Sequence, residues 1–328
     1  MQNRIKIAIA GYGNLGRGVE LSISKNPDME LVGVFSRRDP KSVKTLFSET
    51  EVFHVDAILE FKNSIDVLVL CGGSKDDLPI QAPEFAKYFN IVDSYDTHAK
   101  IPEYFSSVDK PSCENNKVAM IAIGWDPGMF SVNRLYGEAI LPEGETYTFW
   151  GKGLSQGHSD AIRRVNGVKD GVQYTLPSAQ AIEKVRSGVR PTLSTKEKHT
   201  RECYVVLEDG ADAAAVESEI KNMPNYFEPY DTTVHFISQE ELLKNHNKMP
   251  HGGFVIRSGS SSKQNSQVVE YSLALESNPE FTASVMVAYA RATYRLYKKC
   301  DFGAKTAFDV APGLLSIKSA QELRAELL

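Results

Sequence analysis

The chain has 328 residues, of which 42% are hydrophobic and 24% are charged, a composition typical of a globular protein long enough for two domains. Its formal net charge is −5 and it contains no block of five or six like charges, which argues against nucleic acid or an anionic membrane as a partner. No apolar run approaches the roughly 20 residues that a membrane-spanning helix needs, so we expect no membrane association.

The four cysteines (Cys71, Cys113, Cys203 and Cys300) are far apart and form neither a CxxC pair nor a metal-ligand spacing. We therefore expect reduced thiols, no bound metal and a cytoplasmic location. The first 13 residues resemble a signal peptide in having basic residues before an apolar stretch. That stretch is short and leads directly into a glycine turn, so we interpret it as a first strand.

The first 125 residues or so alternate short apolar runs with helical stretches, which is typical of a parallel α/β sheet. Several runs are apolar throughout, as in strands covered by helices on both faces. The predicted strands are 6–11, 30–36, 51–55, 66–72, 90–94 and 118–124, and the predicted helices are 15–25, 83–89 and 101–110. This pattern predicts a Rossmann-like, doubly wound parallel sheet, with a dinucleotide-binding domain over residues 1–124.

After residue 125 the runs become longer and richer in β-formers. The predicted strands are 145–151, 201–209, 232–238, 252–259 and 267–277, and the predicted helices are 127–140, 211–223 and 281–299. We expect an α+β domain with a mixed or antiparallel sheet over residues 125–299, used for substrate binding and dimerisation. The C-terminal segment, about 300–328, is expected to pack back on the first domain.

A glycine turn, "GYGNLG", follows the first predicted strand and opens a helix. In that context G-x-G-x-x-G is typical of dinucleotide binding. Gly11 would make the tight turn, Gly13 would let a pyrophosphate approach, and Gly16 would let helix and strand pack closely. The alternative is an ordinary glycine-rich turn between a strand and a helix.

The end of the second predicted strand indicates which dinucleotide binds. NAD sites usually have an acidic residue there, whereas this chain has Ser36, Arg37 and Arg38. Two guanidiniums and a hydroxyl suit a 2′-phosphate, so we predict NADP(H); a solvated arginine pair is the alternative. The predicted cofactor site also takes in residues of the glycine turn and of the loops after later strands: Asn14, Leu15, Cys71, Gly72, Gly73, Ser74, Asp93, Ser94 and Tyr95.

Two carboxylates, Asp96 and Asp126, each lie in a loop after a predicted parallel strand, at the sheet edge where open α/β folds bind ligands. A pair of carboxylates can bind an ammonium group or transfer protons. Locally, however, Asp126 before Pro127 reads equally well as a helix N-cap with proline at the first helical position, and Asp96 could cap the next turn.

The second region supplies candidate anion contacts in three segments. These candidates are Gln156, His158, Asp160, Arg163, Arg164, His199, Arg201 and His251. A loop histidine is more often structural than functional, so none of these residues carries weight alone.

Taken together, the motifs resemble those of the NADP-dependent meso-diaminopimelate D-dehydrogenase family, nearly end to end. The matching stretches are "GYGNLGRGVE", "VFSRR", "DSYDTH", "GWDPGMFSVNR", "TFWGKGLSQGHSDAIRR", "VQYTLPS", "MPHGGFVI" and "NPEFTAS". The matching landmarks are weaker around 187–200 and 258–266.

The resemblance implies reversible oxidative deamination of the D-configured carbon of meso-2,6-diaminopimelate, giving L-2-amino-6-oxopimelate, ammonia and NADPH, in lysine and cell-wall precursor synthesis. It implies that Asp96, Trp125 and Asp126 lie at the reacting centre and that Thr175, Arg201, His251 and Asn278 bind the far end. It implies that Trp150, Gln156 and Asp160 line the same pocket, and that the protein is a homodimer.

Other two-domain oxidoreductases share the pattern of the first half. Aspartate-semialdehyde dehydrogenases need an activated cysteine, and sugar dehydrogenases of similar layout need a lysine in an E-K-P turn; neither signal is present. A related D-amino acid dehydrogenase of broader specificity and a non-catalytic NADP-binding sensor stay open as alternatives.

Overall fold

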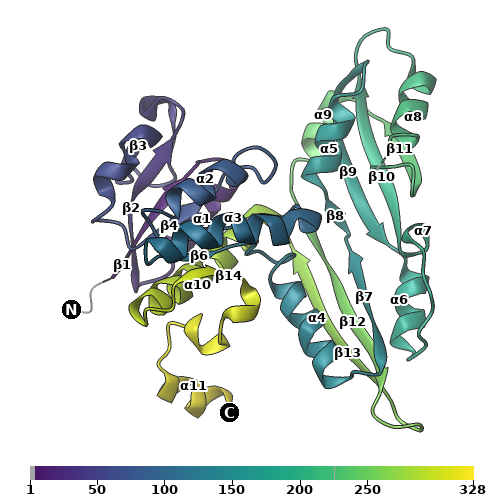
Figure 1. The fold of residues 1–328 in the computed structure, drawn as a ribbon. Helices are drawn as coiled ribbons and strands as arrows, with labels where there is room; N and C mark the ends of the chain where they lie inside the picture. Colours follow the sequence, from purple (N-terminus) through teal and green to yellow (C-terminus); the bar gives the residue numbers. More distant parts are fainter. Residues whose placement is uncertain (1–3, 225) are drawn as a thin grey trace. The chain divides into compact units, whose positions relative to one another are not determined.

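The computed structural model describes residues 4–224 and 226–328 and divides the chain into two compact units (Figure 1). The first unit consists of residues 1–132 and 279–328, and the second of residues 133–278. The boundary therefore falls later than the predicted one at residue 124. The long C-terminal helix, expected in the second domain, groups with the first unit because its apolar face packs into the core of that unit.

The first unit contains a seven-stranded sheet in the order β14-β6-β5-β4-β1-β2-β3, with every pairing parallel. The strands are β1 (Ile5–Ala10), β2 (Met29–Ser36), β3 (Val52–His54), β4 (Val67–Leu70), β5 (Ile91–Asp93), β6 (Val118–Met120) and β14 (Gly303–Lys305). Strand order reverses between β1 and β4, which confirms the doubly wound topology and places a ligand-binding switch point there.

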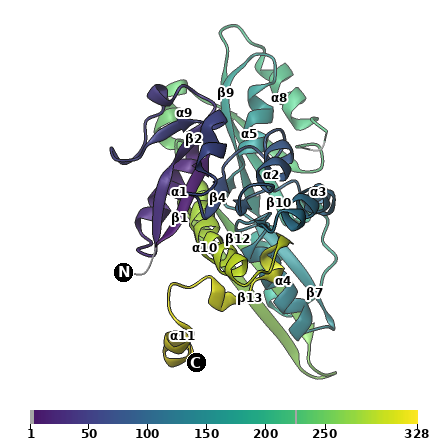
Figure 2. The same ribbon diagram turned by 60° about the vertical axis from the view of Figure 1, so that its left-hand side comes forward.

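Helices cover both faces of this sheet: α1 (Asn14–Ser24), α2 (Leu78–Phe85), α3 (Ile101–Glu114) and α10 (Asn278–Lys298), followed by α11 (Ala320–Leu327). Ile7 and Ile9 of β1 belong to a core shared with α1 and α10, whereas Ala8 and Ala10 belong to a second core shared with α2 and α3. Figures 1 and 2 both show α10 against the sheet. Burial on both faces explains why these strands read as continuous apolar runs.

Two predicted helix starts near prolines are wrong, and α10 begins at Asn278 rather than at residue 281. Helix α2 begins at Leu78 rather than at residue 83, because Pro79 occupies its first turn and Pro83 lies inside it. Helix α4 (Met129–Ile140) begins after Pro127, since residues 125–127 form a turn that a bridge between Gly124 and Gly128 closes.

The second unit has two sheets rather than one. A mixed sheet has the order β11-β10-β9-β8, and an antiparallel sheet has the order β13-β12-β7. The strands are β7 (Gly144–Trp150), β8 (Gly153–Leu154), β9 (Val168–Pro177), β10 (His199–Leu207), β11 (Asp231–Phe236), β12 (His251–Ser260) and β13 (Ser266–Leu275). The expectation of mixed or antiparallel pairing is thus confirmed.

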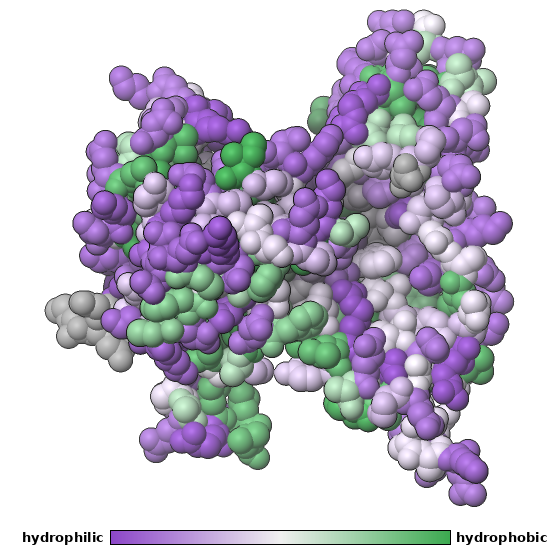
Figure 3. Space-filling model, in the orientation of Figure 1, coloured by the Kyte–Doolittle hydropathy of each residue, from purple (hydrophilic) through white to green (hydrophobic). Residues whose placement is uncertain are grey.

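The helices of the second unit, besides most of α4, are α5 (Gln156–Arg163), α6 (Ala179–Arg186), α7 (Thr195–Lys198), α8 (Ala213–Lys221) and α9 (Gln239–Asn245). Only α8 among these five was predicted, because the others are short and their apolar residues are few. Hydrophilic residues cover much of the visible face of each unit (Figure 3). Within the described residues, no helix is both long and apolar enough to cross a membrane.

Candidate functional site

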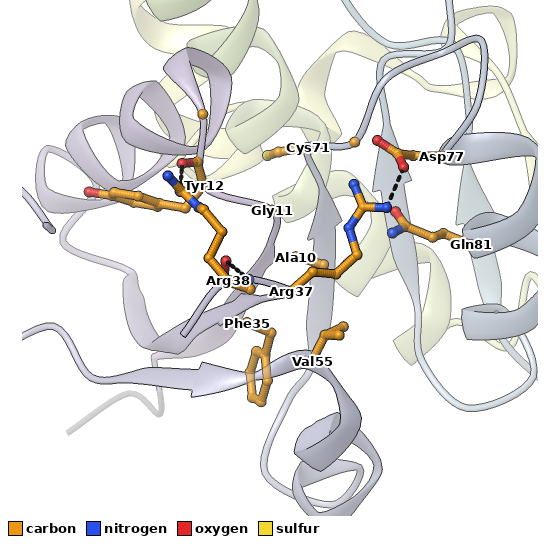
Figure 4. Close-up of a pocket in the computed structure, with 13 residues that line it drawn as sticks. Ala10, Gly11, Tyr12, Phe35, Arg37, Arg38, Val55, Cys71, Asp77 and Gln81 are labelled. Atoms are coloured by element: carbon orange, nitrogen blue, oxygen red, sulfur yellow. Dashed lines mark hydrogen bonds and ion pairs between the residues drawn. The ribbon is translucent and has the colours of Figure 1, made fainter. Parts of the chain in front are cut away.

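A cavity of about 290 Å³ opens at the switch point of the first unit (Figure 4). Residues at the carboxyl ends of β1, β2 and β4 line it, together with residues around the start of α2. The lining residues are Ala10, Gly11, Tyr12, Gly13, Phe35, Ser36, Arg37, Arg38, Val55, Cys71, Gly72, Asp77 and Gln81. Seven of the predicted cofactor residues are in this lining.

The glycine turn has the shape that a bound pyrophosphate needs. Gly11 has a φ of +95°, and a Cβ on Gly16 would lie 2.4 Å from the carbonyl oxygen of Gly11. Apart from its chain neighbours, no atom of the described residues would lie within 4 Å of a Cβ on Gly13, so the space above it is open to a ligand. Gly13 is the N-cap of α1 and makes no side-chain capping bond, which suits a phosphate at the helix N-terminus.

The arginine pair lies at the rim of this cavity. Arg37 Nη1 lies 2.9 Å from Asp77 Oδ1, and Arg38 donates through Nη2 to the carbonyl oxygen of Tyr12 (Figure 4). The Arg38 amide donates to Ser36 Oγ at 3.1 Å. These contacts direct the Arg37 guanidinium toward the start of α2 and the Arg38 guanidinium toward the glycine turn (Figure 4). Asp77, which gave no signal in the sequence, positions Arg37.

A buried acid, Glu20, holds Tyr12 of the glycine turn in place. Glu20 is 1% exposed and accepts hydrogen bonds from the Tyr12 hydroxyl, the Leu46 amide and the Thr50 hydroxyl. Burial, followed by the hydrogen bond to Glu20, raises the pKa of Tyr12 to about 12. Tyr12 is therefore a neutral donor, and its main chain is held in place to accept from Arg38.

Three of the four cysteines are not activated nucleophiles. Burial is the largest cause that raises the pKa of the Cys71, Cys113 and Cys203 thiols, so all three stay protonated at neutral pH. Protonated thiols do not fit the activated cysteine that an aspartate-semialdehyde dehydrogenase needs.

The two predicted catalytic loops follow β5 and β6, which are adjacent parallel strands of the same sheet. Asp96 is exposed, and its amide donates to Ser74 Oγ at 3.2 Å. Asp126 is half-buried beside Trp125, which is 7% exposed and packs edge-to-face on Phe130.

One part of the capping interpretation of Asp126 is wrong. Helix α4 begins at Met129, so Pro127 is not the first helical residue; the Asp126–Pro127 peptide is cis. The Trp125 carbonyl accepts from the Phe130 amide, and the Gly124 carbonyl from the Met129 amide.

Two predicted cofactor residues have buried side chains. Asp93 is 0% exposed with its carboxylate bonded inside the protein, and Tyr95 is 3% exposed and stacks on Tyr104. Their side chains therefore do not line the cavity. The other predicted residues outside its lining lie in loops or helix starts of the same unit: Asn14, Leu15, Gly16, Gly73, Ser74 and Ser94.

In the second unit, Arg201 and Thr175 pair across β10 and β9, and Arg201 donates through Nη1 to Thr175 Oγ1. Thr175 also pairs with Gly153 of β8, and a Cβ on Gly153 would lie 2.5 Å from the His251 ring. The structure thus brings together three residues expected to bind one substrate end, although they are far apart in the sequence.

Arg201 is a buried cation that makes no ion pair with any of the described residues. It is 6% exposed, its Cζ lies 3.9 Å from the centroid of the Tyr230 ring, and its Nε has no hydrogen-bond partner among the described residues. Burial is the main cause that lowers the pKa of Arg201, yet a guanidinium remains charged at neutral pH. A buried charge of this kind calls for an anion. No sequence signal marked Tyr230.

Two candidate anion contacts prove to be neutral histidines. His199 is 2% exposed and its Nε2 accepts from the Trp150 amide at 2.8 Å, so that nitrogen is unprotonated. Burial, then Arg201, lowers the pKa of His199 to about 3 and that of His158 to about 4. Neither histidine is therefore a cationic contact for an anion at neutral pH, and His199 stacks on Trp150.

Two of the remaining predicted residues, Gln156 and Asn278, contact Met249. Gln156 donates to Met249 Sδ at 3.1 Å, and the Asn278 amide donates to the Met249 carbonyl at 2.9 Å. Asp160 lies one turn after Gln156 on the same helix face and pairs with Arg163. Within the described residues, no group of three or more His, Cys, Asp or Glu side chains could hold a metal ion.

A turn shaped for pyrophosphate at the switch point of a parallel sheet, with arginines where an NAD enzyme has a carboxylate, defines the class as an NADP-type dinucleotide-binding oxidoreductase. Comparison with known proteins then narrows the class. Residues 124–277 match the family model described as diaminopimelic acid dehydrogenase C-terminal domain. The meso-diaminopimelate D-dehydrogenase of Ureibacillus thermosphaericus is 64% identical over 99% of this chain and 100% of its own length.

Solved structures of similar fold point to the same family. A mutant of the Clostridium tetani meso-diaminopimelate dehydrogenase, crystallised with DAP, has a TM-score of 0.94 and 51% identity over 99% of this chain and 100% of its own. An engineered D-amino acid dehydrogenase bound to NADP+ has a TM-score of 0.87 and 45% identity over 99% of this chain and 100% of its own. The chain belongs to the meso-diaminopimelate D-dehydrogenase family, as its motifs predicted.

Proposed function

We propose that this protein catalyses the reversible, NADP-dependent oxidative deamination of meso-2,6-diaminopimelate at its D-configured carbon. Substrate, NADP+ and water give L-2-amino-6-oxopimelate, ammonium, NADPH and, for balance, a proton. The function of its relatives, as their names state it, supports the reaction class. The substrate is a small molecule with two ammonium groups and two carboxylates.

The observation that carries the proposal is the state of Arg201. Its buried guanidinium packs on the Tyr230 ring, and its Nε has no partner among the described residues, so it has the chemistry to hold a carboxylate. Such a site strongly disfavours substrates that lack the matching group, because it would leave a buried charge unpaired. A monocarboxylic D-amino acid would leave the arginine in that state.

At the reacting carbon, Asp96 and Asp126 bind the amine that leaves, and one of them accepts a proton as the carbon–nitrogen double bond forms. Trp125, buried against Phe130, forms an apolar wall beside them. Water then adds to the iminium carbon, and ammonia departs. The support is that both loops leave adjacent parallel strands at the ligand-binding edge of the sheet.

At the far end, Arg201, Thr175, His251 and Asn278 bind the L-configured amino acid group. The Thr175 hydroxyl and His251 lie within reach of the same small patch, around Gly153. Trp150, Gln156 and Asp160 line the pocket.

NADP(H) supplies the hydride acceptor and donor when bound. The glycine turn would hold its pyrophosphate at the start of α1, and Ser36, Arg37 and Arg38 would hold its 2′-phosphate. The open space above Gly13 and the uncapped start of α1 support this fit.

The deciding assay follows NADPH formation with the meso, LL and DD isomers of diaminopimelate and with monocarboxylic D-amino acids as separate substrates. We expect turnover with the meso form, none with the LL form, and little with monocarboxylic D-amino acids. NADPH binding without turnover on the meso form would reject the enzyme and favour a sensor. Equal turnover of simple D-amino acids would favour the broader dehydrogenase.

We further propose that the protein is a homodimer that associates through its second unit. Exposed apolar side chains on α4 and β13 support this: Leu135, Tyr136, Ile140, Val268 and Val269. Light scattering after size exclusion should give twice the chain mass of 36.3 kDa. A Val269→Lys variant that stays dimeric would count against this surface.

A cytoplasmic location is also proposed, since all four cysteines are free. Cell fractionation would test it.

A further inference from the structure

Asp93, the last residue of β5, is fully buried, and donors from three different segments bind its carboxylate. The amides of Tyr95 and Ala122 both donate to Oδ1 at 3.0 Å, and the Tyr104 hydroxyl donates to Oδ2 at 2.7 Å. A carboxylate suits this place because it only accepts, and all three neighbours are donors.

The bond from the Tyr95 amide turns the chain directly after β5. An Asp side chain that accepts from the amide two residues ahead makes a local turn of this kind. Tyr95 then stacks on Tyr104 of α3, with ring centroids 3.9 Å apart. The next residue along the chain is Asp96, so its position follows from this turn.

The bonds to the other loop hold a residue in an unfavourable backbone conformation. Ala122 has a φ of +56°, in the left-handed region that residues other than glycine rarely adopt. The Asp93 carboxylate accepts from the Ala122 amide, and the Asp93 carbonyl accepts from the Ile123 amide at 2.9 Å. Trp125 and Asp126 follow directly after, so Asp93 holds the start of their loop through two consecutive amides.

We propose that Asp93 is a positioning residue, which joins the loop of Asp96 to the loop of Trp125 and Asp126 and so sets the spacing of the two carboxylates. Because those carboxylates are assigned to amine binding, this inference rests on the proposed function. It replaces the earlier expectation that the Asp93 side chain binds the cofactor, since its oxygens are bonded inside the protein and it is outside the cavity lining.

Three variants test the inference: Asp93→Ala, Asp93→Asn and, as a matched control, Asp109→Ala. Asn keeps an oxygen for the two amides, and its NH₂ can donate to the Tyr104 hydroxyl oxygen, whereas Ala removes every bond. Asp109 also accepts a backbone amide, that of Ala304 at 2.8 Å, but it ties α3 to β14 and touches neither loop. Each variant is measured well below its unfolding temperature for kcat and KM with meso-diaminopimelate and for the Kd of NADPH by calorimetry.

A spectroscopic measurement does not depend on turnover. The chain has two tryptophans, so a Trp150→Phe background leaves Trp125 as the reporter on the second loop. The emission of Trp125 is then recorded with and without each Asp93 change.

We expect Asp93→Ala to lower kcat at least tenfold, to change Trp125 emission and to leave the Kd of NADPH within threefold. Asp93→Asn should restore most of kcat and the native emission, and Asp109→Ala should affect neither. A tenfold weaker NADPH affinity with unchanged kcat would overturn the inference in favour of a cofactor ligand. A folded Asp93→Ala protein with unchanged kcat and emission would overturn it in favour of a purely structural role.

If Asp93→Ala does not fold, Tyr104→Phe removes the bond to Oδ2 alone and takes its place; unchanged kcat and emission in that variant would overturn the inference. If the unmodified enzyme does not turn over meso-diaminopimelate, the proposed function fails. The emission of Trp125 still decides whether Asp93 positions that loop.

Discussion

Arg201 and Thr175 lie opposite each other on β10 and β9, and the arginine donates to the threonine hydroxyl while its own Nε stays without a partner among the described residues. The pair is therefore a preformed but incomplete set of hydrogen bonds. A carboxylate that accepts from the guanidinium would complete it.

Arg201→Ala should raise KM for meso-diaminopimelate by roughly 10²-fold or more, because hydrogen bonds to a charged group contribute about 1.5–3 kcal/mol each. The Kd of NADPH should stay within twofold. Arg186→Ala is the matched control, since that arginine pairs with Glu183 and Glu270 and has a partly exposed side chain. Equal effects of the two variants on KM would contradict the assignment.

Replacing Arg37 and Arg38 together by Ala should weaken NADP binding far more than NAD binding, by roughly 10² against a few-fold. Calorimetry with both cofactors measures this selectivity. Arg38 also donates to the Tyr12 carbonyl in the glycine turn, so Arg38→Ala alone should weaken the binding of both NADP and NAD. Arg37→Ala alone should weaken the binding of NADP. Equal losses of NADP and NAD affinity in the double variant would refute the 2′-phosphate site.

Gly13→Ala and Gly16→Ala distinguish a loss of space for the cofactor from a loss of packing within the chain. Apart from its chain neighbours, a Cβ at residue 13 meets no atom of the described residues within 4 Å, so we expect stability within about 1 kcal/mol of the parent but NADPH affinity reduced at least tenfold. A Cβ at residue 16 lies 2.4 Å from the Gly11 carbonyl oxygen, so that variant should lose about 1–3 kcal/mol of stability as well. Thermal unfolding and NADPH titration measure the two effects. Normal NADPH affinity in Gly13→Ala would place the pyrophosphate elsewhere.

Asp93 should make folding stability depend on pH. Burial, against the hydrogen bonds from Tyr104, Tyr95 and Ala122, raises the pKa of Asp93 to about 6, above the value of about 3.9 expected in the unfolded chain. The folded state therefore binds the extra proton between these values, so the contribution of this residue is fully present below pH 4 and is lost as pH rises through 6. Burial and Asp93 raise the pKa of Tyr104, which stays protonated throughout.

The asparagine of the Asp93→Asn variant cannot ionise, so the variant should not lose this part of its unfolding free energy as pH rises. Relative to the variant, the unmodified protein should lose roughly 1–3 kcal/mol of unfolding free energy between pH 4 and pH 7. Urea unfolding at both pH values measures the difference. A pH-independent difference would mean that Asp93 does not titrate in this window.

The sequence was most informative where a residue's role is local. Gly11, Gly13 and Gly16 predicted the phosphate turn, because each glycine answers a steric need of the few residues around it. Ser36, Arg37 and Arg38 follow the second strand directly, so the strand pattern was enough to place them. The helix starts at Leu78 and Met129 were missed because proline usually marks the first turn of a helix, whereas Pro83 lies inside α2 and Pro127 lies in the turn before α4.

By itself, then, the amino-acid sequence determined the doubly wound sheet, the family and the residues expected at both ends of the substrate; the roles of those residues are still predictions. Only the tertiary structure decided which side chains are free to act. It joined Thr175, Arg201 and His251 through Gly153, set Tyr230 against Arg201, made His199 an acceptor and buried Asp93 between two loops. These outcomes depend on pairings between distant strands and on burial, which shift pKa values and consume hydrogen bonds in ways that no local pattern of residues encodes.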